Sequence, residues 1–160
     1  MRQVLALAVA CCATLLLAAA PASADDKSVS DAWDSQDPAF EQLSASLKRE
    51  VRAWEKRDST RDGKLLKLYR RGEQLSLKVV AALQAQQPST PQGGQARDLA
   101  IQSTQHLAGH FVAERRFVRA ARPGNAAAAR KAAREAERLY DLSVDVGKQA
   151  KAIFVQLGLD

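Results

Sequence analysis

The chain has 160 residues and carries 24 lysines and arginines against 18 acids, a formal net charge of +6. Its two cysteines, Cys11 and Cys12, and its one methionine, Met1, lie near the amino terminus. If that end is removed, disulfides, thiolate metal ligands and cysteine nucleophiles are excluded, and the fold has to depend on a single hydrophobic core.

The first residues have the three parts of a secretory signal peptide. Arg2 supplies a positive charge, residues 4–20 are almost all apolar, and Ala22 and Ala24 are the small residues of a cleavage site. We expect the signal peptide to span 1–24 and the protein to be periplasmic or secreted in a bacterium, with no transmembrane span after cleavage. Two alternatives stay open: an uncleaved anchor, because the apolar run approaches the length that spans a bilayer, and lipid attachment at Cys11.

Residues 25–36 are polar and acidic around a lone Trp33, and we expect a flexible lead-in there. At Asp37 and Pro38 the pattern changes, because an acid can cap a helix and proline fits its first position. A stripe of apolar residues then recurs at steps of three and four as far as about Arg57, which predicts a first amphipathic helix. The stripe consists of Phe40, Leu43, Leu47, Val51 and Trp54.

Three more helices are predicted along the rest of the chain. Residues 59–62 can cap the second helix, which ends near Pro88. Residues 88–94 are rich in proline and glycine and predict a loop, and the third helix is expected over 95–122. A tight break at 123–125 ends with Asn125, which can cap the fourth helix.

The apolar repeat of the fourth helix is the most regular in the chain. Its members are Ala129, Ala132, Ala136, Leu139, Ser143, Val146, Ala150, Ile153 and Leu157. Because the first half is rich in alanine, a neighbouring backbone could approach it closely.

Four long amphipathic helices and no alternating strand pattern predict an all-α, up-down-up-down four-helix bundle. We expect one domain over 37–160. Glycine is unfavourable inside a helix, so the second helix could break near Gly72 and the fourth near Gly147.

Two histidines and a glutamate suggest a metal site. His106 and His110 are one helical turn apart and Glu114 follows at the next turn, a stripe that can suit zinc, copper or nickel. With Phe111 at the centre of the apolar face, both histidines flank the core instead of pointing into it. Two boundary histidines on a soluble helix are therefore the simpler interpretation.

Other cofactors and catalytic groups have no matching motif. The mature chain has no cysteine pair for covalent haem and no methionine ligand, and two imidazoles on one helix cannot bind opposite faces of one haem iron. A di-iron site needs Glu-x-x-His pairs, which are absent. Neither Ser103 nor Ser143 lies in a nucleophile motif, and there is no phosphate-binding glycine loop. We expect no cofactor, no catalytic residue and no enzymatic activity.

The charge distribution is the most informative feature. The windows 52–71 and 114–138 hold sixteen basic residues against six acids, a net charge of +10, which leaves the rest of the mature chain at −5. Both windows surround helix links that an up-down-up-down bundle places at the same end, so we expect a basic end and an acidic end. Solvated helix faces are the plainer interpretation of such runs.

We therefore expect a non-enzymatic binding protein that contacts an anionic envelope component or an acidic protein partner. The arginines lack interleaved aromatic residues for base stacking, so sequence-specific nucleic acid is not indicated. The residues expected to bind the partner are Arg57, Arg61, Lys64, Arg115, Arg119, Arg122 and Arg130. The alternatives are a periplasmic metal-binding protein that uses the histidine stripe, and a self-assembling bundle, such as a homodimer packed through the alanines of the fourth helix.

Overall fold

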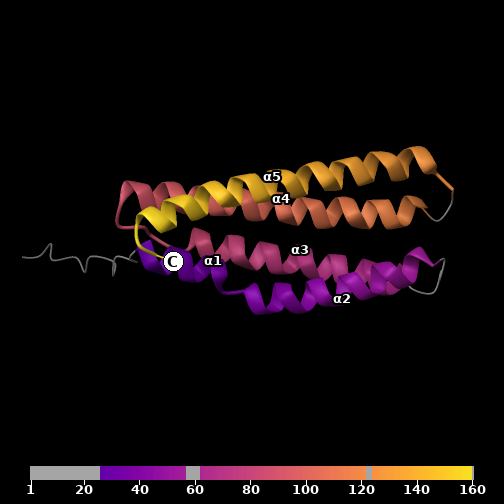
Figure 1. Cartoon of the computed structure of the whole chain (residues 1–160), viewed down its shortest axis with the longest axis horizontal. Helices are drawn as coiled ribbons and strands as arrows, with labels where there is room; N and C mark the ends of the chain where they lie inside the picture. Colours follow the sequence, from indigo (N-terminus) through magenta and orange to yellow (C-terminus); the bar gives the residue numbers. More distant parts are fainter. Residues whose placement is uncertain (1–25, 57–61, 122–123, 160) are drawn as a thin grey trace, which may run out of the picture.

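The computed structural model describes residues 26–56, 62–121 and 124–159, and in this part of the chain every regular element is an α-helix (Figure 1). The helices are α1 (Asp26–Asp34), α2 (Asp37–Glu55), α3 (Asp62–Gln84), α4 (Pro91–Ala121) and α5 (Ala126–Gln156). The four long helices, α2 to α5, pack antiparallel, so the predicted all-α, up-down-up-down bundle is confirmed. The expected signal peptide, 1–24, lies outside the described residues.

Where the sequence indicated a flexible lead-in over 25–36, the structure instead has helix α1. Val29 is fully buried in the core, and Trp33 packs against Phe154 of α5 with ring centroids 5.7 Å apart. A single valine and a single tryptophan give too little periodicity for a prediction, and α1 is a helix that gains its stability from tertiary packing.

The start of α4 also differs from the prediction, because residues 91–94 are helical and not part of a loop. The Thr90 hydroxyl accepts a hydrogen bond from the Gly93 N–H at 2.9 Å, which caps the first turn, and Pro91 fits the first helical position. The carboxylate of Asp26 in α1 in turn accepts hydrogen bonds from the Ser89 N–H at 2.9 Å, the Thr90 N–H at 3.2 Å and the Thr90 hydroxyl at 2.6 Å. Contacts from a distant segment therefore compensate for a poor helix-forming sequence.

Most of the other helix ends agree with the prediction within a residue or two, but α3 ends at Gln84, four residues before Pro88, where its end was expected. Asn125 caps α5, and its side chain accepts a hydrogen bond from the Ala128 N–H at 3.1 Å. At the start of α2 the N-cap is Gln36, which makes no side-chain cap bond, so Asp37 and Pro38 belong to the first turn.

Neither internal glycine breaks its helix. α3 runs without interruption past Gly72 and α5 past Gly147. At Gly72 a close contact is the reason for glycine, because a Cβ atom there would lie 2.6 Å from the ring of Phe111. The ring packs directly against the backbone of α3.

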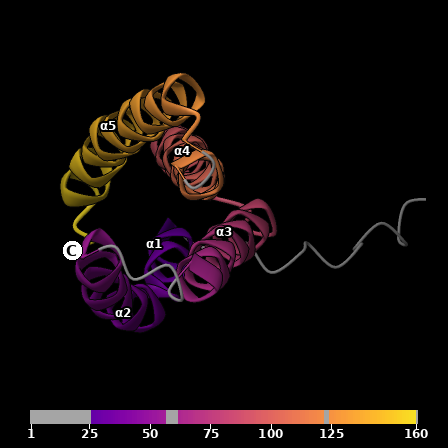
Figure 2. The same cartoon turned by 90° about the vertical axis from the view of Figure 1, so that its right-hand side faces the viewer.

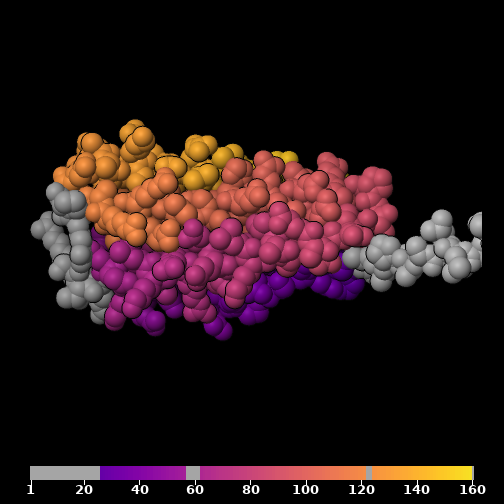
Figure 3. All heavy atoms as spheres, turned by 180° about the vertical axis from the view of Figure 1, so that it is seen from behind, coloured from indigo at the N-terminus to yellow at the C-terminus, as the bar shows by residue number. Residues whose placement is uncertain are grey.

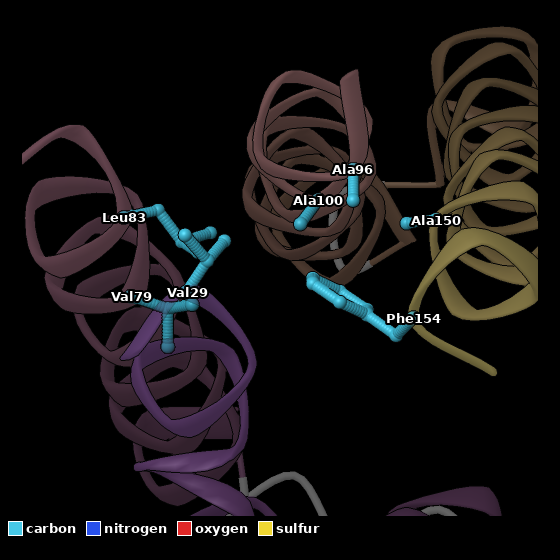
Figure 4. Close-up of a cluster of buried hydrophobic side chains, with 7 residues drawn as sticks. All are labelled: Val29, Val79, Leu83, Ala96, Ala100, Ala150 and Phe154. Atoms are coloured by element: carbon cyan, nitrogen blue, oxygen red, sulfur yellow. The ribbon is translucent and has the colours of Figure 1, made fainter. Parts of the chain in front are cut away.

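The core has two clusters along the bundle. One joins α1, α3, α4 and α5 near the chain ends, and Figure 4 shows Val29 beside Leu83 and Val79 while the Phe154 ring extends beneath α4. The other cluster lies further along the bundle and is built from Leu43, Leu65, Tyr69, Leu75, Phe111 and Val118. Apolar residues recur at steps of three and four along α3, and those buried in these clusters are Leu65, Tyr69, Leu75, Val79 and Leu83.

Helices α4 and α5 are the most closely packed pair. The alanines Ala129, Ala132, Ala136 and Ala150 of α5 are buried, and Leu139 packs over Gly109 of α4. The alanine seam that suggested self-assembly is therefore covered by α4 of the same chain.

Helices α2 and α5 differ from the other neighbouring pairs. They have almost no close backbone contact over the described residues, and viewed along the bundle they are the two ends of an incomplete ring (Figure 2). Among the residues that the structure describes, no helix is both long and apolar enough to span a membrane.

Candidate functional site

The end of α2 and the start of α3 lie at the same end of the bundle as the end of α4 and the start of α5, as Figure 1 shows. The described parts of both basic windows therefore lie at this end. Of the seven residues expected to bind a partner, Lys64, Arg115, Arg119 and Arg130 are described. Arg57, Arg61 and Arg122 lie outside the described residues.

Four basic side chains gather in a shallow groove between α3 and α4, which we call the basic notch: Lys67, Arg70, Arg115 and Arg119. The notch has a volume of about 490 Å³ and is also lined by Leu66, Glu73, Gln74 and Leu77. Its two helices run side by side on the back face of the molecule (Figure 3). Lys64 and Arg130 are exposed near the starts of α3 and α5 and do not line the notch.

Arg115 is the anchored cation of the notch. Its Nη1 atom lies 2.8 Å from Oε2 of Glu73, and the two side chains are only 20% and 25% exposed. Its Nε–H group is buried and has no hydrogen-bond acceptor among the described residues. Glu73 therefore satisfies only part of the guanidinium group.

Lys67, Arg70 and Arg119 are exposed. In the described part of the chain none of the three forms an ion pair, since the one acid that lines the notch, Glu73, is bound to Arg115. The notch therefore presents positive charge that no described acid neutralises. Lys67 and Arg70 belong to the basic window 52–71, but only the packing of α3 on α4 shows that they join Arg115 and Arg119.

A second and larger space lies along the open side between α2 and α5, and we call it the α2–α5 groove. Its volume is about 1140 Å³, and α3 and α4 form its floor. Its apolar lining consists of Trp33, Phe40, Leu43, Leu47, Val51, Val79, Leu107, Phe111, Tyr140, Phe154, Val155 and Leu159. Tyr140 and Val155, on the α5 side, are 50% and 48% exposed, so the groove leaves apolar surface open to solvent.

Most polar groups on the floor of the groove already have partners in the protein. The Ser103 hydroxyl donates to the Ser143 carbonyl oxygen at 2.8 Å, and the Thr104 hydroxyl donates to the Ala100 carbonyl oxygen at 2.8 Å. Burial, together with the hydrogen bond from its hydroxyl to the Glu114 carboxylate and the negative charge of that group, raises the pKa of Tyr69 well above 10.0.

Two of the three residues of the predicted metal stripe become part of this floor. His110 and Glu114 line the groove, and Nδ1 of His110 lies 3.0 Å from the Ala136 carbonyl oxygen, so Nδ1 carries the proton. The His110 ring also packs against the ring of Tyr140 at 5.4 Å. His106 does not line the groove, and the described residues include no group of three or more His, Cys, Asp or Glu side chains that could hold a metal ion.

Charged side chains line the rim of the groove unevenly. Lys48 and Arg52 are one turn apart on α2, in the half that leads to the basic end. Asp34 and Asp37 lie together where α1 meets α2. Partial burial, and to a smaller extent the negative charges of Asp34 and Glu41, raise the pKa of Asp37 above 3.8.

The sequence did not indicate the groove. Its lining residues read as ordinary core positions of amphipathic helices, because Phe40, Leu47 and Val51 would be covered if α2 packed against α5. Only the missing α2–α5 contact leaves them open.

No protein-family model, no curated protein and no solved structure matches the chain. Function has to be inferred from the geometry of the basic notch and the α2–α5 groove.

Proposed function

We propose that this is an exported, non-enzymatic binding protein that contacts an anionic partner through the basic end of its bundle. The observation that carries the proposal is the basic notch, where Lys67, Arg70 and Arg119 surround the Glu73–Arg115 pair without a described acid of their own. Its partner is an anionic component of the cell envelope or an acidic protein. The periplasm or the cell exterior is the compartment that the signal peptide predicts.

Two features of the notch favour binding over a merely solvated surface. Glu73 already holds the Arg115 side chain in place, so Arg115 loses little conformational entropy when a partner binds. Guanidinium groups also present several N–H donors in a plane, which suits phosphate and carboxylate oxygens. These cations also increase the rate at which an anionic partner reaches the notch.

Charge reversal tests the proposal. The variant Arg70→Glu/Arg119→Glu changes the net charge by the same amount as Lys78→Glu/Lys148→Glu, whose lysines are exposed and lie outside the notch. Each protein is immobilised and exposed to envelope extract at about 0.1 M and about 1 M salt, between which the Debye length falls from roughly 10 Å to roughly 3 Å.

We expect the natural protein and the lysine variant to retain partners at the lower salt concentration and release them at the higher one. The arginine variant should retain none. Equal retention by the two variants, or retention that does not respond to salt, would contradict the role of the notch.

A further inference from the structure

The α2–α5 groove is the one side of the bundle where two neighbouring long helices of the described chain do not pack against each other. In a closed four-helix bundle the apolar faces of neighbouring helices cover each other. Here Phe40, Leu47 and Val51 of α2 line a space of about 1140 Å³ that Tyr140 and Val155 of α5 border on the other side. Apolar surface left in water is unfavourable at roughly 25 cal/mol per Å², so an apolar occupant would stabilise the protein.

The interior of the groove favours a chain of methylene groups over a polar molecule. Ser103, Thr104 and Tyr69 line the floor, but their hydroxyl groups already donate to protein acceptors. The Nδ1–H group of His110 likewise donates to the Ala136 carbonyl oxygen. Because these donors are in use, a ligand in the groove mainly meets side-chain carbon.

The shape of the groove favours a long and narrow ligand. On α2 its lining runs from Asp37 to Glu55, about 27 Å at roughly 1.5 Å per residue. The volume lies above the range of roughly 300–1,000 Å³ that is typical of sites for compact small molecules. A linear apolar chain can contact the lining residues along the whole length of the groove.

The rim gives the ligand a direction. Asp34 and Asp37 would repel an anion at the α1–α2 junction. Further along α2, Lys48 and Arg52 offer two cations one turn apart, next to the basic end. Glu55 and Glu114 offset Lys48 and Arg52, whereas Lys151, near the end of α5, offsets one of the two acids at the α1–α2 junction. Over these residues the α1–α2 end keeps a net charge of −1 and the Lys48–Arg52 end has a net charge of 0, so the difference between the ends is small but keeps its sign.

We propose that the α2–α5 groove binds a long-chain fatty acid, with the alkyl chain in the groove and the carboxylate at Lys48 and Arg52. The methyl end of the chain then lies toward Trp33 and Phe154. This site is separate from the basic notch, and it can exist whether or not the notch binds an envelope partner.

Tryptophan quenching tests both the occupancy and the direction. Bromine quenches tryptophan fluorescence at short range, and Trp33 lines the groove while Trp54 does not. We expect stearate brominated near its methyl end to quench the protein more strongly than stearate brominated near its carboxyl end. The response should persist in Trp54→Phe and disappear in Trp33→Phe.

Chain length tests whether the alkyl chain is buried. Displacement of the brominated probe by unlabelled saturated fatty acids should strengthen with each added methylene, by up to about fourfold per group. Equal displacement by short and long chains, or no quenching at all, would overturn the proposal.

Paired variants separate the groove from the rest of the surface. Val155→Asp places a charge at the groove, whereas Leu77→Asp places one at a leucine of similar exposure, 52% against 48%, on the notch side. We expect the first variant to weaken fatty-acid binding by about tenfold, because a carboxylate would have to be desolvated, and the second to leave it unchanged. Circular dichroism and the unfolding midpoint establish that both variants are folded.

The head-group site has its own matched pair. Lys48→Glu/Arg52→Glu should weaken fatty-acid binding by about tenfold. Arg130→Glu/Arg134→Glu, with the same charge change and spacing on α5, should not affect it. If sedimentation instead showed a dimer that dissociates in Val155→Asp while no fatty acid bound, a second copy would occupy the groove and the fatty-acid proposal would be wrong.

Discussion

Replacing Asp26 with alanine tests whether α1 is an integral part of the bundle. The Asp26 carboxylate accepts three hydrogen bonds from Ser89 and Thr90, and Thr90 caps the first turn of α4. The side chain is only 8% exposed, so water cannot fully replace these bonds. The substitution therefore disconnects α1 from α4 and leaves buried donors without an acceptor.

The expected loss can be derived from these contacts. Loss of a helix cap costs about 0.5–2 kcal/mol, and a hydrogen bond to a charged group contributes roughly 1.5–3 kcal/mol where it is well buried. Because the site lies near the surface, we expect Asp26→Ala to lower the free energy of unfolding by about 2 kcal/mol. For a domain of this size that corresponds to a fall of about 7 °C in the unfolding temperature.

The pH dependence gives a second measurement. Burial by itself would raise the pKa of Asp26, but the hydrogen bonds from Thr90 and Ser89 outweigh it and hold the pKa below 3.8. A lowered pKa means that the contribution of the group is complete above 3.8 and is lost as the pH falls through the folded-state value. Urea denaturation should therefore show the full difference between wild type and Asp26→Ala at pH 6, and a shrinking difference below about pH 4.

Two further variants make the reasoning refutable. Gly93→Ala should destabilise the protein, because the added methyl group would overlap the Asp26 carboxylate. Combined with Asp26→Ala, it should cost much less than the sum of the two single changes, since the clash is gone. If the single changes were additive, or if Asp26→Ala cost less than about 0.5 kcal/mol at pH 6, the link between α1 and α4 would not hold α1 in place.

Three other predictions follow from single positions. The side chain of Leu83 is fully buried beside Val29, so Leu83→Ala should lower the free energy of unfolding by about 2–5 kcal/mol in urea denaturation. A smaller loss would mean that α1 does not cover the core at this position. Asn125→Ala should cost about 1 kcal/mol, because the Ala128 N–H loses its acceptor; Asn125→Asp, which keeps that oxygen, is the control. Asp37→Asn should raise the free energy of unfolding at pH 7, because the raised pKa of Asp37 means that its charged form is disfavoured in the folded state. The gain should vanish below about pH 3.8, where the carboxyl group is protonated in both the folded and the unfolded protein. A gain that persists at lower pH would contradict this prediction.

The sequence by itself determined the fold class, because each long helix carries its own apolar stripe and its own boundary signals. Leu65, Leu75 and Val79 of α3 are buried as their spacing predicts, and Asn125 caps α5. The antiparallel order follows from helices joined by short links, and it brings both basic windows to one end. These features depend on residues near each other in the chain, where helical periodicity and capping act.

Tertiary structure alone decided α1, the early start of α4 and both binding sites. Asp26 and Thr90 are 64 positions apart, and no local pattern relates them. The notch exists because α3 packs on α4, which adds Lys67 and Arg70 to Arg115 and Arg119. The groove exists because α2 does not pack on α5, although the apolar stripe of α2 would look the same in a closed bundle. A helical stripe specifies which face is apolar, whereas the packing of all the helices together decides what covers that face.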